Sequence, residues 1–300
     1  MELRDALRSG PLICDGAMGT ELQRRGLSRG ETSDSWNVTH PDQVEAVHRA
    51  YIHAGAQIIL TNTFGSNAMR LGAGSQYSVK QLNQAAVKIA RNCAVENILV
   101  FGDMGPSGLG DQLPPYGTRP EQAFYDTFKE QAIALAEAGV DAILVETMSN
   151  LAEARIAVRA AKKNTDLPII CTMSFARPPA SRPDDFRSPW GDALWDIVNG
   201  LTQEGAEVLG SNCGDLVEEM PQLASKMREI TKLPLIFEVN AGRPQVDEKY
   251  RSIYSLEPQG LAEIAVQLVE AGADIVGGCC GTTPDHIAAI KGRLEGMALP

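Results

Sequence analysis

The sequence predicts an α/β fold, a single (β/α)8 TIM barrel that occupies residues 1–300 as one domain. Two patterns predict it: eight short apolar segments alternate with amphipathic stretches, and one helix-then-strand unit recurs along the chain. Barrels of this class commonly reach about 250 residues as one unit, so the length requires no second domain. An open doubly wound sheet is the alternative. No G-x-G-x-x-G turn follows any strand, which disfavours a nucleotide-binding open sheet.

Eight segments are expected to be buried strands because each is a short apolar run. In chain order they are PLICDG near residue 11, IILTNT near 58, ILVFGD near 98, AILVET near 142, LPIICTMS near 167, VLGSNC near 208, LPLIFEVN near 233 and DIVGGCC near 274. The stretches between them, such as DQVEAVHRAYIHAG and EQAFYDTFKEQAIALAEAG, carry apolar residues at three- and four-residue spacing. That spacing is typical of amphipathic helices.

The recurring unit is an amphipathic helix that ends on glycine and is followed by a strand. Its four copies are YIHAGAQIILTNT, LAEAGVDAILVET, LTQEGAEVLGSNC and LVEAGADIVGGCC. Gly55, Gly139, Gly205 and Gly272 stand where the end of a helix needs left-handed backbone. Two long loops, residues 103–117 and 176–191, follow the third and fifth strands. In a barrel, both would lie on the face where active sites form.

Composition excludes several classes of protein. The formal net charge is −11 and no cluster of Lys and Arg is present, which disfavours nucleic acid as a partner. The charged segment MELRDALRSG leads directly into a strand and does not resemble a signal peptide. No apolar run approaches the about 20 residues that cross a bilayer. We therefore expect a cytoplasmic protein with no membrane partner, whose six cysteines are reduced thiols.

Polar or metal-binding residues stand at the end of every predicted strand. They are Asp15, Asn62, Asp103, Glu146, Ser174, Cys213, Asn240 and the Cys279-Cys280 pair. The carboxyl ends of barrel strands converge on one mouth, so these distant positions are expected to form one cluster.

Three of these residues predict a metal site. Cys213, Cys279 and Cys280 suit one Zn²⁺, which in catalytic sites takes three protein ligands and keeps an open fourth position. Adjacent strand residues face opposite sides, so Cys279 and Cys280 can share an ion only if the backbone leaves strand geometry there. The flanking Gly277, Gly278 and Gly281 permit that departure. The alternatives are packed core cysteines or a redox-active pair.

The other cysteines and the histidines are predicted to be structural. Cys14 should face away from the side on which Asp15 lies, Cys93 lies in a helix and Cys171 in the middle of a strand. None of the four histidines stands at a strand end, so we expect surface or packing roles for them and no histidine-based zinc site. They are His40, His48, His53 and His286.

Six collinear motifs resemble the homocysteine S-methyltransferase family. They are DGAMGTEL (15–22), TNTF (61–64), ETMSNLAEA (146–154), SNCG (211–214), NAG (240–242) and GGCCGTTPDHI (277–287). The chain most resembles the homocysteine-binding module of cobalamin-dependent methionine synthase and the betaine-homocysteine methyltransferases. The resemblance spans nearly the whole chain and implies a barrel in which three cysteines hold zinc and the sulfur of homocysteine completes the tetrahedron.

The resemblance also implies substrate-binding roles. Asp15 and Glu146 would hold the ammonium group of homocysteine, and amides near Gly19 and Thr20 would receive its carboxylate. Two carboxylates neutralise an ammonium well in a partly desolvated pocket, and a glycine-rich turn exposes backbone donors. Read alone, Asp15 could instead form a turn before Gly16, and Glu146 could begin the following helix. Three asparagines could orient substrate or tie loops together; they are Asn62, Asn212 and Asn240.

The predicted function is zinc-dependent methyl transfer to the thiol of homocysteine, which gives methionine. No catalytic residue is predicted beyond the metal site. The methyl donor stays open between a corrinoid on a separate protein, a methyltetrahydrofolate-linked partner and a small sulfonium or betaine-type molecule. The chain has no D-x-H-x-x-G corrinoid motif of its own. The alternatives are a different thiol acceptor or a non-catalytic module that binds zinc or a thiol.

Overall fold

The computed structural model describes residues 2–28, 30–243, 245–246 and 252–296, and these residues form a (β/α)8 barrel. Eight parallel strands in this part of the chain pair in the order β1-β10-β7-β6-β5-β4-β3-β2. They are β1 (Leu12–Ile13), β2 (Ile58–Leu60), β3 (Leu99–Met104), β4 (Ala142–Met148), β5 (Ile169–Met173), β6 (Val208–Asn212), β7 (Leu235–Val239) and β10 (Ile275–Gly278). Each predicted apolar segment contains one of these strands.

The sheet closes between its first and second strands. Cys14 and Ile58 form a parallel bridge, and the Asp15 N–H donates to the Ile58 carbonyl at 2.9 Å. On the other side of the bridge, the Gln57 N–H donates to the Ile13 carbonyl at 2.8 Å. An open doubly wound sheet would leave two unpaired edges instead. The predicted barrel is therefore confirmed and the open-sheet alternative is wrong.

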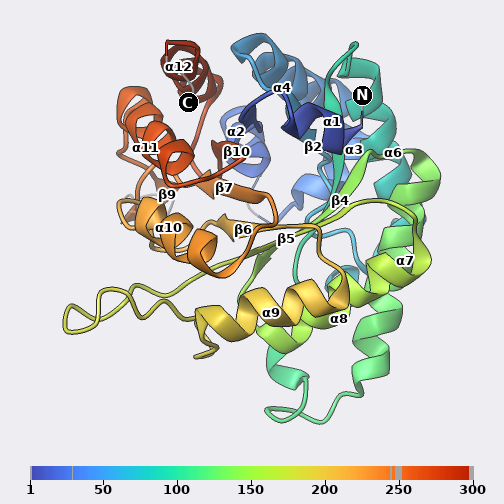
Figure 1. Ribbon diagram of the computed structural model, residues 1–300. Coiled ribbons are helices and arrows are strands. Elements are labelled where there is room, and N and C mark those ends of the chain that lie inside the picture. The colour runs from blue at the N-terminus through green and yellow to red at the C-terminus, as the bar shows by residue number, and fades with distance from the viewer. Residues whose placement is uncertain (1, 29, 244, 247–251, 297–300) are drawn as a thin grey trace.

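Eight long helices form a ring around the strands, as Figure 1 shows. They are α4 (Pro41–Ala54), α6 (Val79–Cys93), α7 (Glu121–Ala138), α8 (Leu151–Asn164), α9 (Leu194–Glu204), α10 (Met220–Ile230), α11 (Pro258–Glu270) and α12 (Pro284–Glu295). The shorter helical segments are α1 (Leu3–Leu7), α2 (Met18–Arg24), η1 (Ser33–Ser35), α3 (Trp36–Thr39), α5 (Ala68–Leu71) and η2 (Gly110–Gln112). None of the described helices has the length and apolarity that a membrane crossing needs.

Glycines end the repeated helices as predicted. Gly55, Gly139 and Gly205 cap α4, α7 and α9 with φ of 110°, 94° and 104°. Gly272, with φ of 98°, directly follows Ala271, the C-cap residue of α11. This left-handed backbone is open to glycine at little cost, so each helix stops there and the next strand begins within a few residues.

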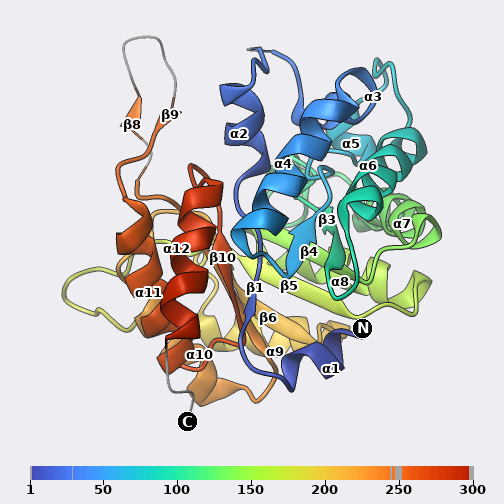
Figure 2. The ribbon, with the colours of Figure 1, turned by 90° about the horizontal axis from the view of Figure 1, so that it is seen from above.

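The apolar core has two parts, one inside the barrel and one between strands and helices. The inner part includes Ile58, Leu144 and Ile236, and it is joined by Leu3 and Ala6 of α1. Figure 2 shows α1 at the opposite end of the barrel from α2 and the hairpin β8 (Gln245–Val246) and β9 (Ser252–Ile253). The expectation that the N-terminal segment leads directly into a strand was wrong, because its apolar residues cover one end of the barrel interior.

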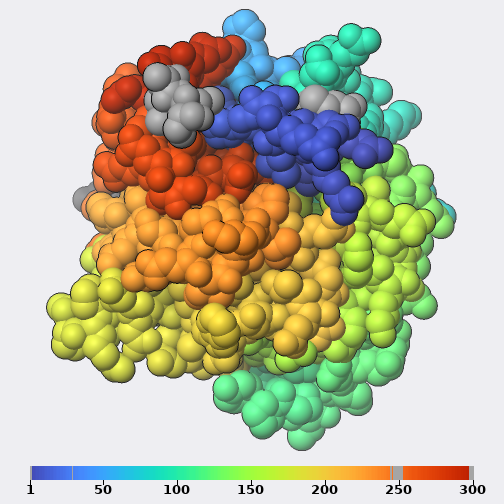
Figure 3. All heavy atoms as spheres, in the orientation of Figure 1, coloured from blue at the N-terminus to red at the C-terminus, as the bar shows by residue number. Residues whose placement is uncertain are grey.

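The two predicted loops contact each other. The Tyr116 ring of the first loop lies with its centre 4.7 Å from that of Trp190 in the second. Within the second loop, Ala176 and Arg187 form an antiparallel bridge. Figure 3 shows this loop, in yellow-green, protruding from one side of the molecule. Both loops follow the carboxyl ends of their strands, which is the end at which the predicted site residues stand.

Candidate functional site

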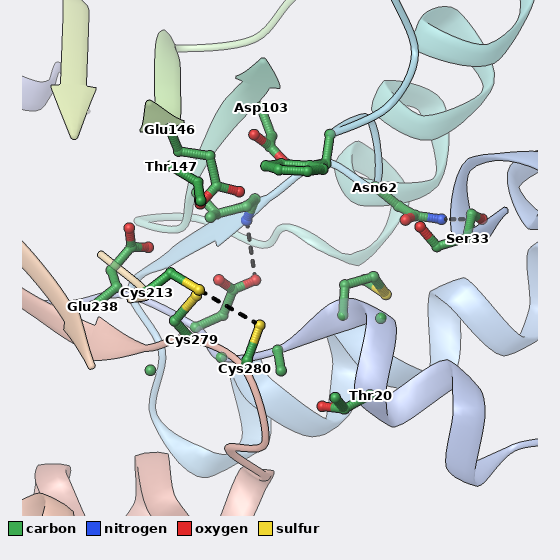
Figure 4. A pocket seen from close by; sticks show the side chains of 18 of the residues that line it. Thr20, Ser33, Asn62, Asp103, Glu146, Thr147, Cys213, Glu238, Cys279 and Cys280 are labelled. Carbon is green, nitrogen blue, oxygen red and sulfur yellow. Dashed lines mark hydrogen bonds between the residues drawn. The ribbon is translucent and has the colours of Figure 1, made fainter. Parts of the chain in front are cut away.

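A cavity of about 350 Å³ lies at the carboxyl ends of the strands, and Figure 4 shows it from close by. It brings together seven of the predicted strand-end residues, which are Asp15, Asn62, Asp103, Glu146, Cys213, Cys279 and Cys280. Gly19 and Thr20, from the first turn of α2, also line it. Ser174, Asn212 and Asn240 do not. The convergence predicted from the strand ends therefore holds for most of these residues.

The three predicted metal ligands form a cluster. The Sγ atoms of Cys213, Cys279 and Cys280 all lie within 4.8 Å of one another, and those of Cys213 and Cys280 are 3.9 Å apart. A tetrahedral zinc with Zn–S bonds of about 2.3 Å holds its sulfur ligands about 3.8 Å apart. The spacing of the thiols is therefore consistent with a zinc site. All three side chains are partly exposed toward the cavity.

The backbone leaves strand geometry at the Cys279-Cys280 pair, as the sharing of one ion requires. β10 ends at Gly278, and Gly281 has φ of 83°. A Cβ on Gly278 would lie 2.4 Å from the Thr282 hydroxyl, which itself donates to the Cys279 carbonyl at 2.7 Å. The glycines thus create the space in which the chain turns and both thiols face the same side.

The three thiols have different pKa values because they contact one another. Hydrogen bonds from Cys279 and Cys280 lower the pKa of Cys213 far below that of a free thiol. The same contacts raise the pKa of Cys279, and the hydrogen bond with Cys213 raises that of Cys280. One negative charge is therefore stabilised by its neighbours and opposes the formation of a second. A divalent cation between the sulfurs would offset this repulsion, because thiolates are the form that binds metal.

The remaining cysteines are free and buried, and none of them belongs to the thiol cluster. Cys93 lies in α6 and Cys171 in β5. The expectation that Cys14 faces away from the side of Asp15 was wrong. Cys14 belongs to the apolar cluster inside the barrel, and its Sγ lies 3.8 Å from Oδ1 of Asp15, because the chain leaves the strand after Cys14 and turns that carboxyl inward.

Four buried carboxyls share the cavity with the thiols. They are Asp15, Asp103, Glu146 and Glu238, with exposed fractions between 1% and 9%. Burial is the largest cause that raises the pKa of each, and repulsion from Glu146 adds to it for the other three. Among the described residues that line the cavity, none is Lys, Arg or His. The pocket therefore has no positive side chain to balance its carboxyls, and it favours a ligand that carries a positive charge.

Glu238 was missed by the sequence analysis. It is only 1% exposed, and neither of its carboxyl oxygens has a hydrogen-bond partner in the described part of the chain. Its backbone carbonyl accepts from the Cys213 N–H at 3.3 Å, which places it beside the sulfur cluster. A signal was available, because an acidic residue two positions before Asn240 in an apolar strand faces the same side of that strand.

Asp15 and Glu146 both reach the cavity, from different elements. Asp15 follows β1, and its Oδ2 accepts from the Leu60 N–H at 3.0 Å. Glu146 lies within β4, five residues before α8 begins, so the alternative that it starts that helix is wrong. The Thr20 hydroxyl accepts from the Gly281 N–H at 3.3 Å, which ties α2 to the turn that carries the cysteines.

The side chains of Asn62 and Asn240 form hydrogen bonds within the protein. The Asn62 amide donates to the Ser33 carbonyl at 2.7 Å and to Asn37 at 3.0 Å, so it ties the η1 segment to the end of β2. Asn240 donates to the Gly214 carbonyl at 2.9 Å, while its Oδ1 is buried without a partner among the described residues. Loop tying, one of the two alternatives for these asparagines, therefore describes Asn62 well.

Asn212 is fully buried and lies between the carboxyl of Glu146 and the thiol of Cys279. Its Nδ2 donates to Oε2 of Glu146 and, at 2.7 Å, to the Thr147 hydroxyl. Its Oδ1 accepts from the Thr147 N–H at 2.9 Å. Thr147 has φ of 57°, which is rare for a β-branched residue, so these bonds hold a strained bulge of β4 in place. Nδ2 also lies 3.8 Å from Sγ of Cys279.

The histidines lie away from the cavity, as predicted. His48 is fully buried in α4, and burial lowers its pKa to about 4. His286 takes part in the capping box of α12 with Thr283. None of the four lines the cavity in the described part of the chain.

The fold and the site together define a class of protein: a (β/α)8 barrel with a cluster of three cysteines, spaced as a zinc site requires, in the mouth of the barrel. The sequence profile of the homocysteine S-methyltransferase family matches residues 12–294. The chain belongs to this family, and the resemblance drawn from its motifs is confirmed.

Individual relatives agree with this assignment. The chain is 30% identical to the methionine synthases of Mycobacterium leprae and Mycobacterium tuberculosis over 98% and 100% of its length, and it spans about a quarter of theirs (25% and 26%). The crystal structure of the Escherichia coli homocysteine methyltransferase MmuM in its metallated form is 28% identical, with a TM-score of 0.80 over 97% of this chain and 99% of that one. A methyltransferase from Methanosarcina mazei shares the fold, with 14% identity and a TM-score of 0.60 over 97% of this chain and 96% of that one.

Proposed function

We propose that this chain is a zinc-dependent S-methyltransferase that moves a methyl group to the thiol of homocysteine and so forms methionine. The observation that carries the proposal is the cluster of three thiols, all within 4.8 Å of one another, in a cavity walled by carboxyls. Cys213, Cys279 and Cys280 would hold one Zn²⁺. Three protein ligands leave a fourth position for the thiol of the substrate.

The chemistry divides between the ion and the chain. A bound zinc would lower the pKa of the substrate thiol, which is about 8.5 in the free thiol, and would so keep its sulfur nucleophilic at neutral pH. The chain binds and orients the amino acid: Asp15 and Glu146 receive the ammonium, and amides at Gly19 and Thr20 receive the carboxylate. In the transfer, a sulfur–carbon bond forms as the bond between the methyl group and its donor breaks.

The donor is proposed only by class: a corrinoid on a separate protein, a folate-linked partner protein or a small sulfonium or betaine-type molecule. A cytoplasmic location is proposed as well. All six cysteines are free thiols in the structure, which suits a reducing compartment.

Metal analysis combined with a methylation assay tests the proposal. We expect about one zinc per chain and transfer to homocysteine with at least one of methylcobalamin, methyltetrahydrofolate with a corrinoid protein, S-methylmethionine or betaine. A parallel panel of thiols, which includes cysteine and glutathione, measures acceptor choice. Zinc-loaded protein that methylates another thiol faster than homocysteine would refute the acceptor, and protein that binds homocysteine but no metal would refute the mechanism.

Asn212 provides a test of how the site is positioned. Replacing Asn212 with Ala removes the donor to Glu146, a charge-assisted hydrogen bond worth about 1.5–3 kcal/mol. We expect homocysteine affinity, measured by calorimetry, to fall about tenfold or more while zinc content is unchanged. Asn199→Ala, in which the lost side chain donates to the Trp195 carbonyl on α9, is the matched control. Equal homocysteine affinity in the two variants would contradict the role of Asn212.

A further inference from the structure

The four carboxyls of the cavity differ in whether their oxygens already have hydrogen-bond partners within the protein. Both oxygens of Asp15 have partners: Oδ2 accepts from the Leu60 N–H, and Oδ1 lies 3.8 Å from the Cys14 thiol. Asp103, in contrast, is 4% exposed and its Oδ1 has no partner in the described part of the chain. A buried carboxyl oxygen without a partner costs free energy unless a ligand supplies the missing donor.

The backbone of Asp103 is held rigidly. Its N–H donates to the Thr61 hydroxyl at 3.0 Å, and its carbonyl accepts from the Thr63 hydroxyl at 2.7 Å. The Gln131 amide reaches the same carbonyl at 3.4 Å. Phe101, two residues earlier on β3, points into the barrel, and the alternation of the strand sends the Asp103 side chain to that side as well. The carboxyl is therefore fixed in direction before any ligand arrives.

Asp103 and Glu146 lie side by side. Their carboxyls come from the neighbouring strands β3 and β4, and Figure 4 shows them on the same wall of the cavity. Burial raises the pKa of Asp103, and repulsion from Glu146 and a hydrogen bond with it raise that pKa further. A shared cation removes this repulsion, because both carboxyls are then stabilised in their charged forms.

Glu238 is less suited to the same cation. Figure 4 shows its side chain beside Cys213, on the sulfur side of the cavity. In homocysteine, a carbon chain separates the sulfur from the ammonium group, and the ammonium must therefore sit away from the metal ligands. The Asp103–Glu146 pair provides a carboxyl surface at that position.

We propose that Asp103 is a substrate-binding residue that shares the ammonium of the acceptor with Glu146 and restricts acceptors to thiols that carry a protonated amine. This inference rests on the proposed function and extends the ammonium site beyond Asp15 and Glu146. An ammonium has three donors, enough to serve one oxygen from each of the three carboxyls. The unpartnered Oδ1 of Asp103 is then satisfied only in the complex.

Calorimetry on the zinc-loaded protein tests this with three thiols: homocysteine, 3-aminopropanethiol, which lacks the carboxylate, and 4-mercaptobutyrate, which lacks the amine. In Asp103→Asn, we expect the Kd of the two amines to rise about 10- to 100-fold, the range for loss of a charge-assisted hydrogen bond. The Kd of 4-mercaptobutyrate should not rise, because this thiol has no amine for Asp103 to bind. Asp111→Asn, at an exposed position of the following loop, is the matched control. Zinc content and thermal unfolding are measured for each, and Asp103→Ser serves as a second variant.

The outcomes distinguish failure of the Asp103 role from failure of the proposed function. Equal losses for all three thiols, or no loss for homocysteine, would overturn the role of Asp103 alone. Selective loss for the two amines with unchanged zinc would support it. If the wild-type protein holds zinc but binds none of the three thiols, the proposed function fails and the inference fails with it.

Discussion

Replacing Cys280 with Ala is expected to reduce zinc from about one ion per chain to almost none and to lower methyl transfer at least about 1000-fold. Cys280 Sγ lies 3.9 Å from that of Cys213, and two remaining thiolates form an incomplete site for a metal that prefers four ligands. Loss of zinc removes the means of generating a substrate thiolate at neutral pH. Elemental analysis of the purified protein and the methylation assay measure the two effects.

Cys93→Ala is the matched control, because Cys93 is a buried cysteine of α6 that does not belong to the cluster. It should lower stability modestly and leave zinc content unchanged. Circular dichroism of Cys280→Ala should match that of the wild type, since the Cys280 side chain is partly exposed in the cavity and not packed in the core. A folded, metal-free Cys280→Ala protein that still transfers methyl groups would refute zinc-dependent chemistry.

The barrel could be predicted from the sequence because the patterns that mark its strands and helix ends are local. Strands appear as short apolar runs, and Gly55, Gly139 and Gly205 mark helix ends through a backbone conformation that other residues avoid. The cluster of three cysteines could be predicted for a related reason. Cys213 and the Cys279-Cys280 pair stand at strand ends, and a closed barrel forces strand ends together whatever the details of packing.

The roles of individual polar residues could not be predicted in the same way. Asn62 and Asn212 both stand at strand ends, yet Asn62 binds the η1 segment and Asn212 binds Glu146. These partners come from other elements and depend on side-chain directions that the sequence does not encode locally. α1 was missed because a helix of five residues carries little periodicity, and its stability comes from the barrel interior that it covers.

Replacing Glu146 with Gln is expected to weaken homocysteine binding by about 30- to 150-fold, because a buried charge-assisted contact of about 2–3 kcal/mol is lost. Gln is nearly isosteric and can still accept from Asn212 through its carbonyl oxygen, so the strained bulge at Thr147 should persist. Zinc content should stay at about one ion per chain, since Glu146 does not belong to the thiol cluster.

Calorimetry with homocysteine measures this effect, and Glu137→Gln on the exposed face of α7 is the matched control. Affinity equal to that of the control would refute the ammonium role of Glu146, and loss of zinc would assign Glu146 to the metal site instead. Because the cavity has carboxyls and, among its described lining residues, no basic side chain, removal of one carboxylate also lessens repulsion within it. Binding of an amine-free thiol that carries a carboxylate should therefore tighten in the same variant, because the cavity repels it less.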